Sequence, residues 1–208
     1  MGGNAGQGSG TCWLKQKLGK PTSAGSNVVT GAKTGKINVL TVVSAFYADM
    51  DVTSQVKNFK SGNNIVIDTA NLYVTFGNDP WPNVPKTLTI LLTNGTATRV
   101  FVAPEGSGKY TLAPSGTGSA PNVVDTFLAP NTATTAVFST VWGLSQISIQ
   151  SVYNNFNSLI ASKNTFTGSN SLFGTDTWQG VQKTGVVWYT SGGAIVAKAI
   201  REYQSYHF

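Results

Sequence analysis

The feature that most constrains this chain is an internal repeat. Nineteen residues from Phe76, FGNDPWPNVPKTLTILLTN, return 97 positions later from Phe173 as FGTDTWQGVQKTGVVWYTS, and 8 of the 19 positions are identical. Self-similarity at a fixed spacing is the signature of a duplicated structural unit. Any fold proposed for this chain must therefore be one that the sequence can build twice.

The repeat extends over most of the sequence. Glu105 matches Glu202 at the same spacing, and upstream the spacing becomes 95, where Asn27 matches Asn122. Units of about ninety residues are large enough for a small core of their own. We predict a Gly-rich basic arm followed by two β domains, with these boundaries: 1–21, 22–114 and 115–208.

The composition favours β structure. Only 11% of the residues are charged, another 11% are aromatic, and glycine occurs 23 times. A chain with this balance is typical neither of disorder nor of helical proteins. We expect a mostly all-β fold in which two tandem β-sandwich-like domains each carry one short helix.

Strand and turn patterns agree with that expectation. Residues 86–93 alternate leucine or isoleucine with threonine, which predicts a half-buried strand. Asn94-Gly95 then predicts a tight hairpin with both turn residues at positive φ, followed by a return strand over 98–103. The second unit repeats this plan with strands over 186–189 and 194–200 and a turn over 191–193.

One short helix is predicted ahead of the hairpin in each unit. Val52, Val56 and Phe59 stand at i, i+4 and i+7 behind Asp51, and the same spacing recurs in the second unit behind Ser148. Aspartate and serine are both good helix N-caps. Each unit should therefore begin its helix at the capping residue.

The first unit also carries a family pattern. The shared residues are SAFYA at 44–48, DVT at 51–53, Val56, FG at 76–77, DPWP at 79–82, Val84 and KTL at 86–88. They resemble the uncharacterised β-rich domain found at the C-terminus of a mitochondrial DnaJ-like protein and in fungal and bacterial proteins. Three positions depart from that pattern: Ala48 and Asn83 replace glycines, and Asn78 is an extra residue. The resemblance covers most of residues 37–113 and implies a β-rich module with no established activity, so it assigns no catalytic residue.

The loop before the hairpin has two interpretations. A structural turn is favoured, because Asn83 and its counterpart Gly180 both tolerate a left-handed backbone and Asp79 can accept a backbone N–H bond, as can its counterpart. In the alternative, Trp81 and Trp178 are exposed platforms for sugar rings or partner side chains. A twinned pair of such platforms would add avidity.

The reactive residues argue against an enzyme. The one histidine, His207, is the penultimate residue, and the one cysteine, Cys12, lies in the Gly-rich arm. Nucleophilic catalysis needs a buried base held beside its nucleophile, whereas a penultimate histidine is usually solvated. No zinc-ligand spacing and no phosphate-binding glycine pattern occurs. A single cysteine cannot form a disulfide within the chain. We predict no catalytic residue, no cofactor and no metal site.

The arm is the predicted assembly element. Cys12, Trp13 and Leu14, with Leu18 after them, could add as a strand to an exposed sheet edge or dock the indole into a groove. If the recipient is a neighbouring subunit, the contact repeats from molecule to molecule and yields rings or filaments. The predicted partner is therefore a second copy of the chain.

Positive charge gathers ahead of the first β strand. Five lysines and no acid occur before Asp49, so the first 48 residues carry +5 of the total charge of +6. Lys15, Lys17 and Lys20 are the candidate anion contacts. With no arginine and wide spacing, this segment is poorly suited to nucleic acid.

No membrane segment is expected, because no window of 18 apolar residues occurs. We also expect no signal peptide, since MGGNAGQGSG has no apolar stretch. The compartment stays undetermined, although the composition resembles that of extracellular or particle-forming β proteins.

Three function hypotheses follow. The favoured one is a non-enzymatic, self-associating structural or scaffold subunit of a filament, shell or surface assembly. The alternative is a lectin-like or toxin-like protein with Trp81 and Trp178 as glycan platforms. A weaker third hypothesis is a nucleic-acid-packaging coat subunit.

Overall fold

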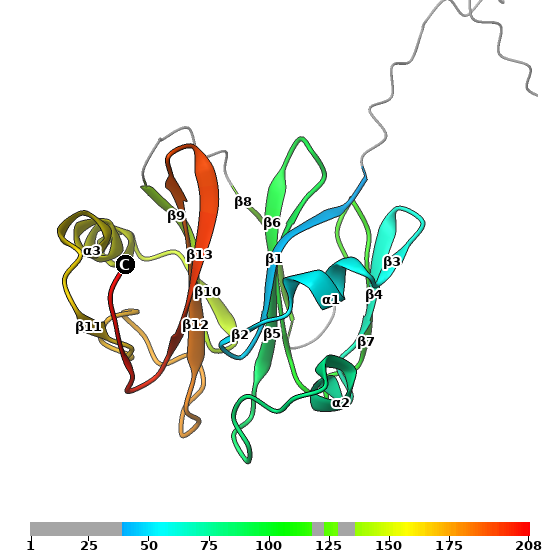
Figure 1. Ribbon diagram of the computed structural model, residues 1–208, viewed down its shortest axis with the longest axis horizontal. Coiled ribbons are helices and arrows are strands. Elements are labelled where there is room, and N and C mark those ends of the chain that lie inside the picture. The colour runs from blue at the N-terminus through cyan, green and yellow to red at the C-terminus, as the bar shows by residue number, and fades with distance from the viewer. Residues whose placement is uncertain (1–38, 118–122, 129–135) are drawn as a thin grey trace, which may run out of the picture. The chain divides into compact units, whose positions relative to one another are not determined.

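The structure, a computed structural model, describes residues 39–117, 123–128 and 136–208, which are mostly β (Figure 1). All of them belong to one compact unit, Asn38–Phe208. The predicted mostly all-β fold is confirmed.

The first repeat supplies seven strands and two helices. They are β1 (Thr41–Tyr47), β2 (Met50–Asp51), α1 (Thr53–Lys57), β3 (Lys60–Ser61), β4 (Asn64–Asp68), α2 (Leu72–Phe76), β5 (Thr87–Thr93), β6 (Thr98–Pro104) and β7 (Lys109–Leu112).

The second repeat follows a similar order with one helix among its described residues. Its elements are β8 (Val124–Leu128), β9 (Ala136–Trp142), β10 (Ser145–Ile147), α3 (Gln150–Ser162), β11 (Phe166–Thr167), β12 (Thr184–Ser191), β13 (Ala194–Arg201) and β14 (Ser205–Tyr206).

Equivalent strands form equivalent antiparallel sheets. The first repeat builds the order β2-β1-β5-β6-β8 and a small sheet β3-β4-β7, while the second builds β10-β9-β12-β13 and the pair β11-β14. The ladder between β1 and β5 skips Val43, and the ladder between β9 and β12 skips Phe138, which stands 95 positions later. The two repeats therefore share strand register and a bulge as well as sequence.

One strand breaks this equivalence. β8 belongs to the second repeat by sequence, yet it pairs with β6 of the first repeat over five residues, from Thr98 opposite Leu128 to Val102 opposite Val124. Among the described residues, β13 pairs only with β12. The first sheet thus has five described strands and the second has four.

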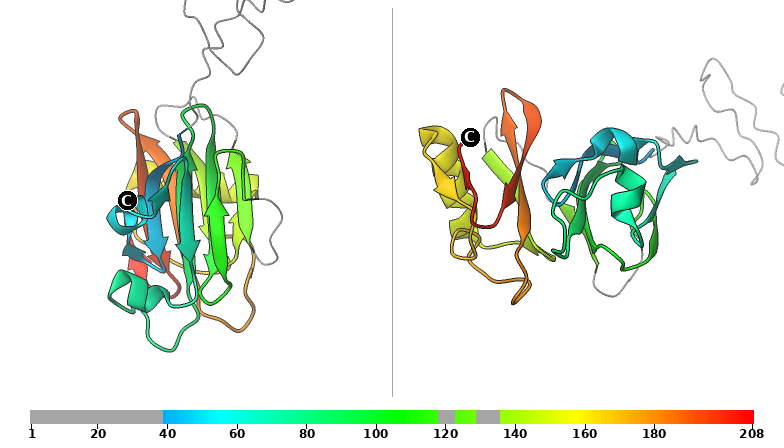
Figure 2. Two further views of the ribbon diagram at one scale, coloured as in Figure 1. Left: turned by 90° about the vertical axis from the view of Figure 1, so that its right-hand side faces the viewer. Right: turned by 60° about the horizontal axis from the view of Figure 1, so that its bottom comes forward.

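The core consists of three clusters of apolar side chains, through which the two large sheets pack against their helices and against each other. On β5, Leu88, Ile90 and Leu92 pack toward α1 and α2, which lie on one side of the first sheet (Figure 2). Leu91 points the other way, into a cluster that draws residues from both repeats. The prediction of a half-buried strand over 86–93 is therefore wrong: a strand is present, but β5 is buried on both faces.

The cluster between the two large sheets uses equivalent positions of each repeat. Its buried members are Phe46, Leu91, Val100, Val102, Val141, Val186 and Trp188. The indole N–H of Trp188 also donates to the Ser44 hydroxyl oxygen over 2.8 Å. The contact is therefore a core, with an internal hydrogen bond that fixes the orientation of the largest side chain.

The helices differ from the prediction in their starts, number and lengths. α1 has Val52 and α3 has Ile149 at the N-cap, and neither receives a side-chain cap bond. Asp51 instead accepts the N–H of Thr53 over 2.8 Å. α2 is a second helix in the first repeat, and α3 has 13 residues. Residues 157–162, NSLIAS, continue that helix, whereas Gly62 at φ +60° turns the chain at the equivalent place.

Both hairpins were predicted, but the turns are of different kinds. Gly192 and Gly193 have φ of +58° and +80°, which fits a two-residue turn between β12 and β13. Between β5 and β6 only Gly95 has positive φ, and the Asn94 side chain accepts the N–H groups of Thr96 and Ala97. The prediction of positive φ at both turn residues is wrong for Asn94, because its side chain supports a longer loop.

Candidate functional site

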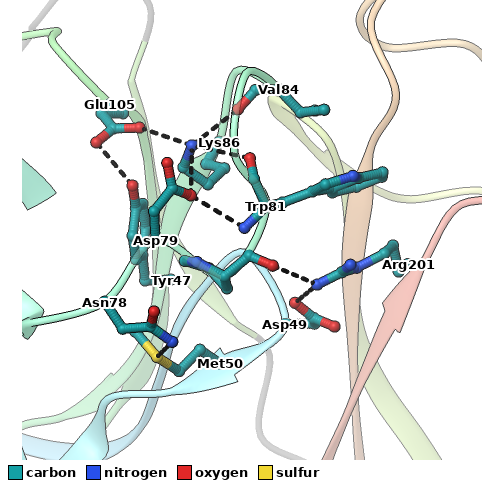
Figure 3. Close-up of polar contacts among 11 residues, drawn as sticks. Tyr47, Asp49, Met50, Asn78, Asp79, Trp81, Val84, Lys86, Glu105 and Arg201 are labelled. Atoms are coloured by element: carbon teal, nitrogen blue, oxygen red, sulfur yellow. Dashed lines mark hydrogen bonds and ion pairs between the residues drawn. The ribbon is translucent and has the colours of Figure 1, made fainter. Parts of the chain in front are cut away.

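A buried lysine organises the loop between α2 and β5. The Lys86 ammonium donates to the carbonyl oxygens of Trp81, over 3.2 Å, and Val84, over 2.9 Å. It also forms ion pairs with Asp79, at 3.0 Å, and with Glu105, at 3.4 Å (Figure 3). Four acceptors thus surround an ammonium that has three N–H bonds to give.

The second repeat reproduces this arrangement contact for contact. The Lys183 ammonium donates to the carbonyl oxygens of Trp178, over 3.3 Å, and Val181, over 2.7 Å. Its ion pairs are with Asp176, at 3.0 Å, and with Glu202, at 3.4 Å. We call these two arrangements the lysine networks. Because the contacts are equivalent, the residues that are identical in the two repeats form the same connected set of contacts within each repeat.

The backbone of the loop explains why these residue types recur. Asp79 accepts the N–H of Trp81 over 3.0 Å, and Asp176 makes the equivalent bond with Trp178. Asn83 has φ +62° and Gly180 has φ +74°. The predicted aspartate turn and the predicted left-handed position are both confirmed.

Electrostatics in the two lysine networks favour the ionised form of the two aspartates. For Asp176, the hydrogen bond from Lys183 is the main reason why its pKa lies below the usual value. For Asp79, burial acts to raise the pKa, but the contact with Lys86 and the backbone bond from Trp81 outweigh it and lower the pKa. Both aspartates are therefore expected to be charged near neutral pH.

An aromatic ring lies beside each ammonium. Lys86 is 5.7 Å from the ring centre of Tyr47, and Lys183 is 6.0 Å from that of Trp142, the equivalent residue. The Tyr47 hydroxyl donates to Glu105 over 2.7 Å. Burial, followed by this bond and the charge of Glu105, raises the pKa of Tyr47 far above the usual value, so the phenol stays protonated.

The first lysine network is joined to the second repeat by an arginine. Arg201, at the end of β13, places its guanidinium 2.5 Å from Asp49 and 3.0 Å from the carbonyl oxygen of Pro80. The same guanidinium lies 4.5 Å from the ring centre of Trp81 (Figure 3). A sugar ring stacking on that face of Trp81 would have to displace Arg201.

The two predicted platforms are thus not equivalent. Trp81 and Trp178 are both half-buried, and only Trp81 has a cation stacked on it among the described residues. The glycan hypothesis stays a prediction, now resting more on Trp178 than on a matched pair.

Most of the remaining predicted residues cannot be placed, and His207 belongs to neither lysine network. The assembly residues Cys12, Trp13, Leu14 and Leu18 and the candidate anion contacts Lys15, Lys17 and Lys20 lie outside the described residues. His207 is exposed near the end of the described chain.

Sequence reasoning missed the residues that differ between the repeats. Arg201 stands where the first repeat has Pro104, and Asp49 stands where the second has Leu144. Their contact with each other is visible only in three dimensions. Such mismatched positions are, however, the signal by which a residue specific to one repeat could have been shortlisted.

Two classes of site find no support in the part of the chain that the structure describes. No three of its His, Cys, Asp and Glu side chains gather closely enough to hold a metal ion. None of its helices is long and apolar enough to cross a membrane.

Comparison of the chain with family models, with curated proteins and with solved structures found no match. The resemblance to the DnaJ-associated β-rich domain therefore stays a prediction.

Proposed function

We propose that this protein is a non-enzymatic structural subunit that associates with copies of itself. The outer edge of β13 is the observation that carries the proposal. Among the described residues this strand pairs only with β12, and Ile195 on it is 42% exposed. An unpaired strand edge presents backbone N–H and C=O groups that can pair with another chain.

A lysine, Lys198, lies on this strand, but its side chain contacts an aromatic ring of its own molecule. Lysines on an edge strand commonly block pairing with another chain. The Lys198 ammonium lies 5.7 Å from the ring centre of Tyr206 in the same repeat. This cation–π contact keeps the ammonium beside the ring, so that the lysine is less able to block pairing with an approaching strand.

The lysine networks support a structural role for the loops that contain them. Each ammonium is surrounded by carboxylates and backbone carbonyls. A lysine nucleophile would have to face a substrate, whereas both of these side chains are almost fully buried and face these acceptors. We therefore assign both lysine networks to loop architecture.

Sedimentation velocity across a range of protein concentrations tests the proposal. We expect the mean sedimentation coefficient to rise with concentration. Ile195→Lys should weaken that rise, because it adds a charge at an exposed position of the β13 edge. The control is Val74→Lys on α2, where the native side chain is 64% exposed. A single monomeric species at every concentration would rule out self-association.

A further inference from the structure

We propose that the second repeat binds a neutral saccharide in an open groove between α3 and the segment that begins at β11. The groove has a volume of about 440 Å³, and sites for small molecules commonly span ~300–1,000 Å³. α3 and β11 lie on the same side of the second large sheet (Figure 1). Neither Trp81 nor Trp178 lines the groove, so it is a different site from the predicted platforms. Binding there is independent of the self-association proposed above.

Neutral polar side chains form most of the groove wall. They are Asn155, Ser158, Thr167, Ser169 and Ser171. Each hydroxyl can both donate and accept a hydrogen bond, and the amide offers two N–H bonds and a carbonyl oxygen. Asn155 and Ser158 are exposed on α3, so their polar atoms are open to a ligand. The Ser169 and Ser171 hydroxyl oxygens lie 2.9 Å apart, which leaves one hydroxyl proton of that pair for a ligand.

Apolar side chains complete the lining. Leu159 and Leu172 are half-buried, and Phe166 beside them is buried. A sugar ring has C–H groups on its faces and hydroxyl groups around its rim. The leucines and the phenylalanine suit the C–H groups, while the polar wall suits the hydroxyl groups.

The lining favours a neutral ligand over a charged or an apolar one. None of the described residues that line the groove carries a charge. A charged ligand would lose hydration there without gaining an ion pair. An apolar ligand would cover the polar wall and leave its groups without hydrogen-bond partners. A compound rich in hydroxyl groups avoids both penalties, and saccharides are the common biological compounds of this kind.

The turn that carries two of the serines is fixed to the core. The fully buried Trp142 donates its indole N–H to the side-chain oxygen of Asn170 over 2.8 Å. Phe173, at the end of the same turn, stacks on that indole. The Ser169 hydroxyl oxygen accepts the N–H of Leu172 over 3.2 Å. This part of the wall is therefore in position before a ligand arrives, which lowers the ordering cost of binding.

The lining differs between the repeats. Ser169 and Ser171 stand 97 positions after Leu72 and Val74 of α2. α3 also continues through Ser158, whereas the first repeat has β3 at the equivalent place. Two apolar positions of the first repeat are thus serines in the second, which fits a binding site that is specific to one repeat.

A titration of the isotope-labelled full chain, followed through assigned backbone amide chemical shifts, tests the site. The probes are the methyl glycosides of glucose, galactose, mannose and N-acetylglucosamine, with N-acetylneuraminic acid as the charged comparison. We expect at least one neutral glycoside to shift the amides of residues 155–159 and 166–172 until they saturate. The charged sugar should bind at least ~tenfold more weakly, because it loses hydration without gaining an ion pair.

Two variants test the groove wall directly. Ser158→Lys places a long charged side chain at an exposed position of the wall and should raise the Kd for the glycoside at least ~tenfold. Ser171→Val introduces the residue that the first repeat carries at the equivalent position and should raise the Kd several-fold through loss of a hydroxyl. Ala161→Lys is the matched control, because Ala161 is exposed on α3 outside the groove lining. It should leave the Kd unchanged.

A longer ligand distinguishes two sources of the same chemistry. For a glycoside that binds, its trisaccharide should bind more tightly if the ligand is a glycan chain, because a chain gains further contacts along the groove. Equal affinity would assign the groove to a free sugar.

Three results would overturn the saccharide site. The first is that no neutral glycoside gives a saturable shift at the groove amides. The second is that the shifts surround Trp178 and disappear in Trp178→Ala, which would assign binding to that indole. The third is that N-acetylneuraminic acid binds as tightly as the neutral glycosides, since the groove would then not select an uncharged ligand. Sedimentation of the native protein decides self-association separately and changes none of these outcomes.

Discussion

At the scale of single residues, the ammonium groups of the two lysine networks have the same contacts, but the glutamates of the two networks are buried to different depths. The Glu202 side chain is 2% exposed, while that of Glu105 is 19% exposed and also accepts the Tyr47 hydroxyl. A carboxylate that loses its cation is penalised most where water cannot reach it. The second lysine network should therefore be the more sensitive of the two.

Lys183→Met is expected to lower the free energy of unfolding by about 3–5 kcal/mol, the range for removing one partner of a buried ion pair. Lys86→Met should lower it by less: each glutamate keeps one donor, the Tyr47 hydroxyl for Glu105 and the backbone N–H of residue 183 for Glu202, but only Glu105 also keeps appreciable contact with solvent. Urea denaturation measures both values. Adding Glu202→Gln to Lys183→Met should restore part of the loss. Equal losses in the two single variants would contradict this difference in depth.

The lowered pKa values of the aspartates in the lysine networks determine whether the free energy of unfolding rises or falls with pH. Since the pKa of Asp176 is lowered on folding, its stabilising contribution is present above the unfolded-state value of about 3.9 and is lost as pH falls through the folded-state pKa. We expect Asp176→Asn to be less stable than the native protein at neutral pH and to lose less stability on acidification. Urea midpoints measured through the acid range test this. Parallel pH profiles for the two proteins would refute the assignment.

Ala48 and Gly143 occupy the same left-handed position in the two repeats. Their φ angles are +52° and +54°, and a Cβ on Gly143 would lie 2.7 Å from the Thr177 hydroxyl oxygen. Ala48→Gly should raise the free energy of unfolding by about 0.5–1 kcal/mol by relieving the backbone. Gly143→Ala should lower it by more than that, because it adds a clash. Thermal unfolding of both variants checks the two signs, and a stabilising Gly143→Ala would be inconsistent with them.

At the scale of elements, a glycine on β12 permits the aromatic packing of the second repeat. The Trp142 and Phe173 rings are stacked with centroids 4.2 Å apart. A Cβ on Gly185 would lie 2.7 Å from atoms of both rings and 2.6 Å from the Val141 carbonyl oxygen. This strand can therefore carry only glycine at that point without moving its neighbours.

Gly185→Ala is expected to lower the free energy of unfolding by about 1–3 kcal/mol, as overpacking of a core does. Gly180→Asn is the matched control, because its Cβ would meet open space and the first repeat has Asn83 at that position with a similar φ. Circular dichroism during thermal unfolding distinguishes the two. If Gly185→Ala is as stable as the control, the stacked pair does not depend on the close approach.

Those elements could be predicted from the sequence whose signal lies in a short stretch of residues. The hairpins around β5 and β12 follow from alternation and turn glycines, and the turn roles of Asp79 and Asn83 follow from their residue types. The length of α3 and the sheet that receives β8 were not predicted, because they depend on packing between the repeats. Arg201 was missed for the same reason, since its partner Asp49 lies 152 positions away.

At the scale of the whole described unit, the repeats are not independent. They share the cluster around Leu91 and Trp188, and β8 extends from one repeat into the sheet of the other. A destabilising change in one repeat must then be felt in the other, because unfolding either one exposes the shared core.

Val186→Ala tests this coupling, since Val186 is a buried member of the shared cluster on the second repeat. The substitution should lower the free energy of unfolding by ~2 kcal/mol through lost apolar burial and the cavity left behind. Pulsed hydrogen exchange with mass spectrometry, read separately for β5 and β12 across a urea series, should show both strands losing protection at the same lowered midpoint. Val152→Ala on α3, outside the shared cluster, serves as the comparison. A shift confined to β12 in Val186→Ala would mean that the two repeats unfold as separate units, and the shared cluster would then be a contact between domains and not a common core.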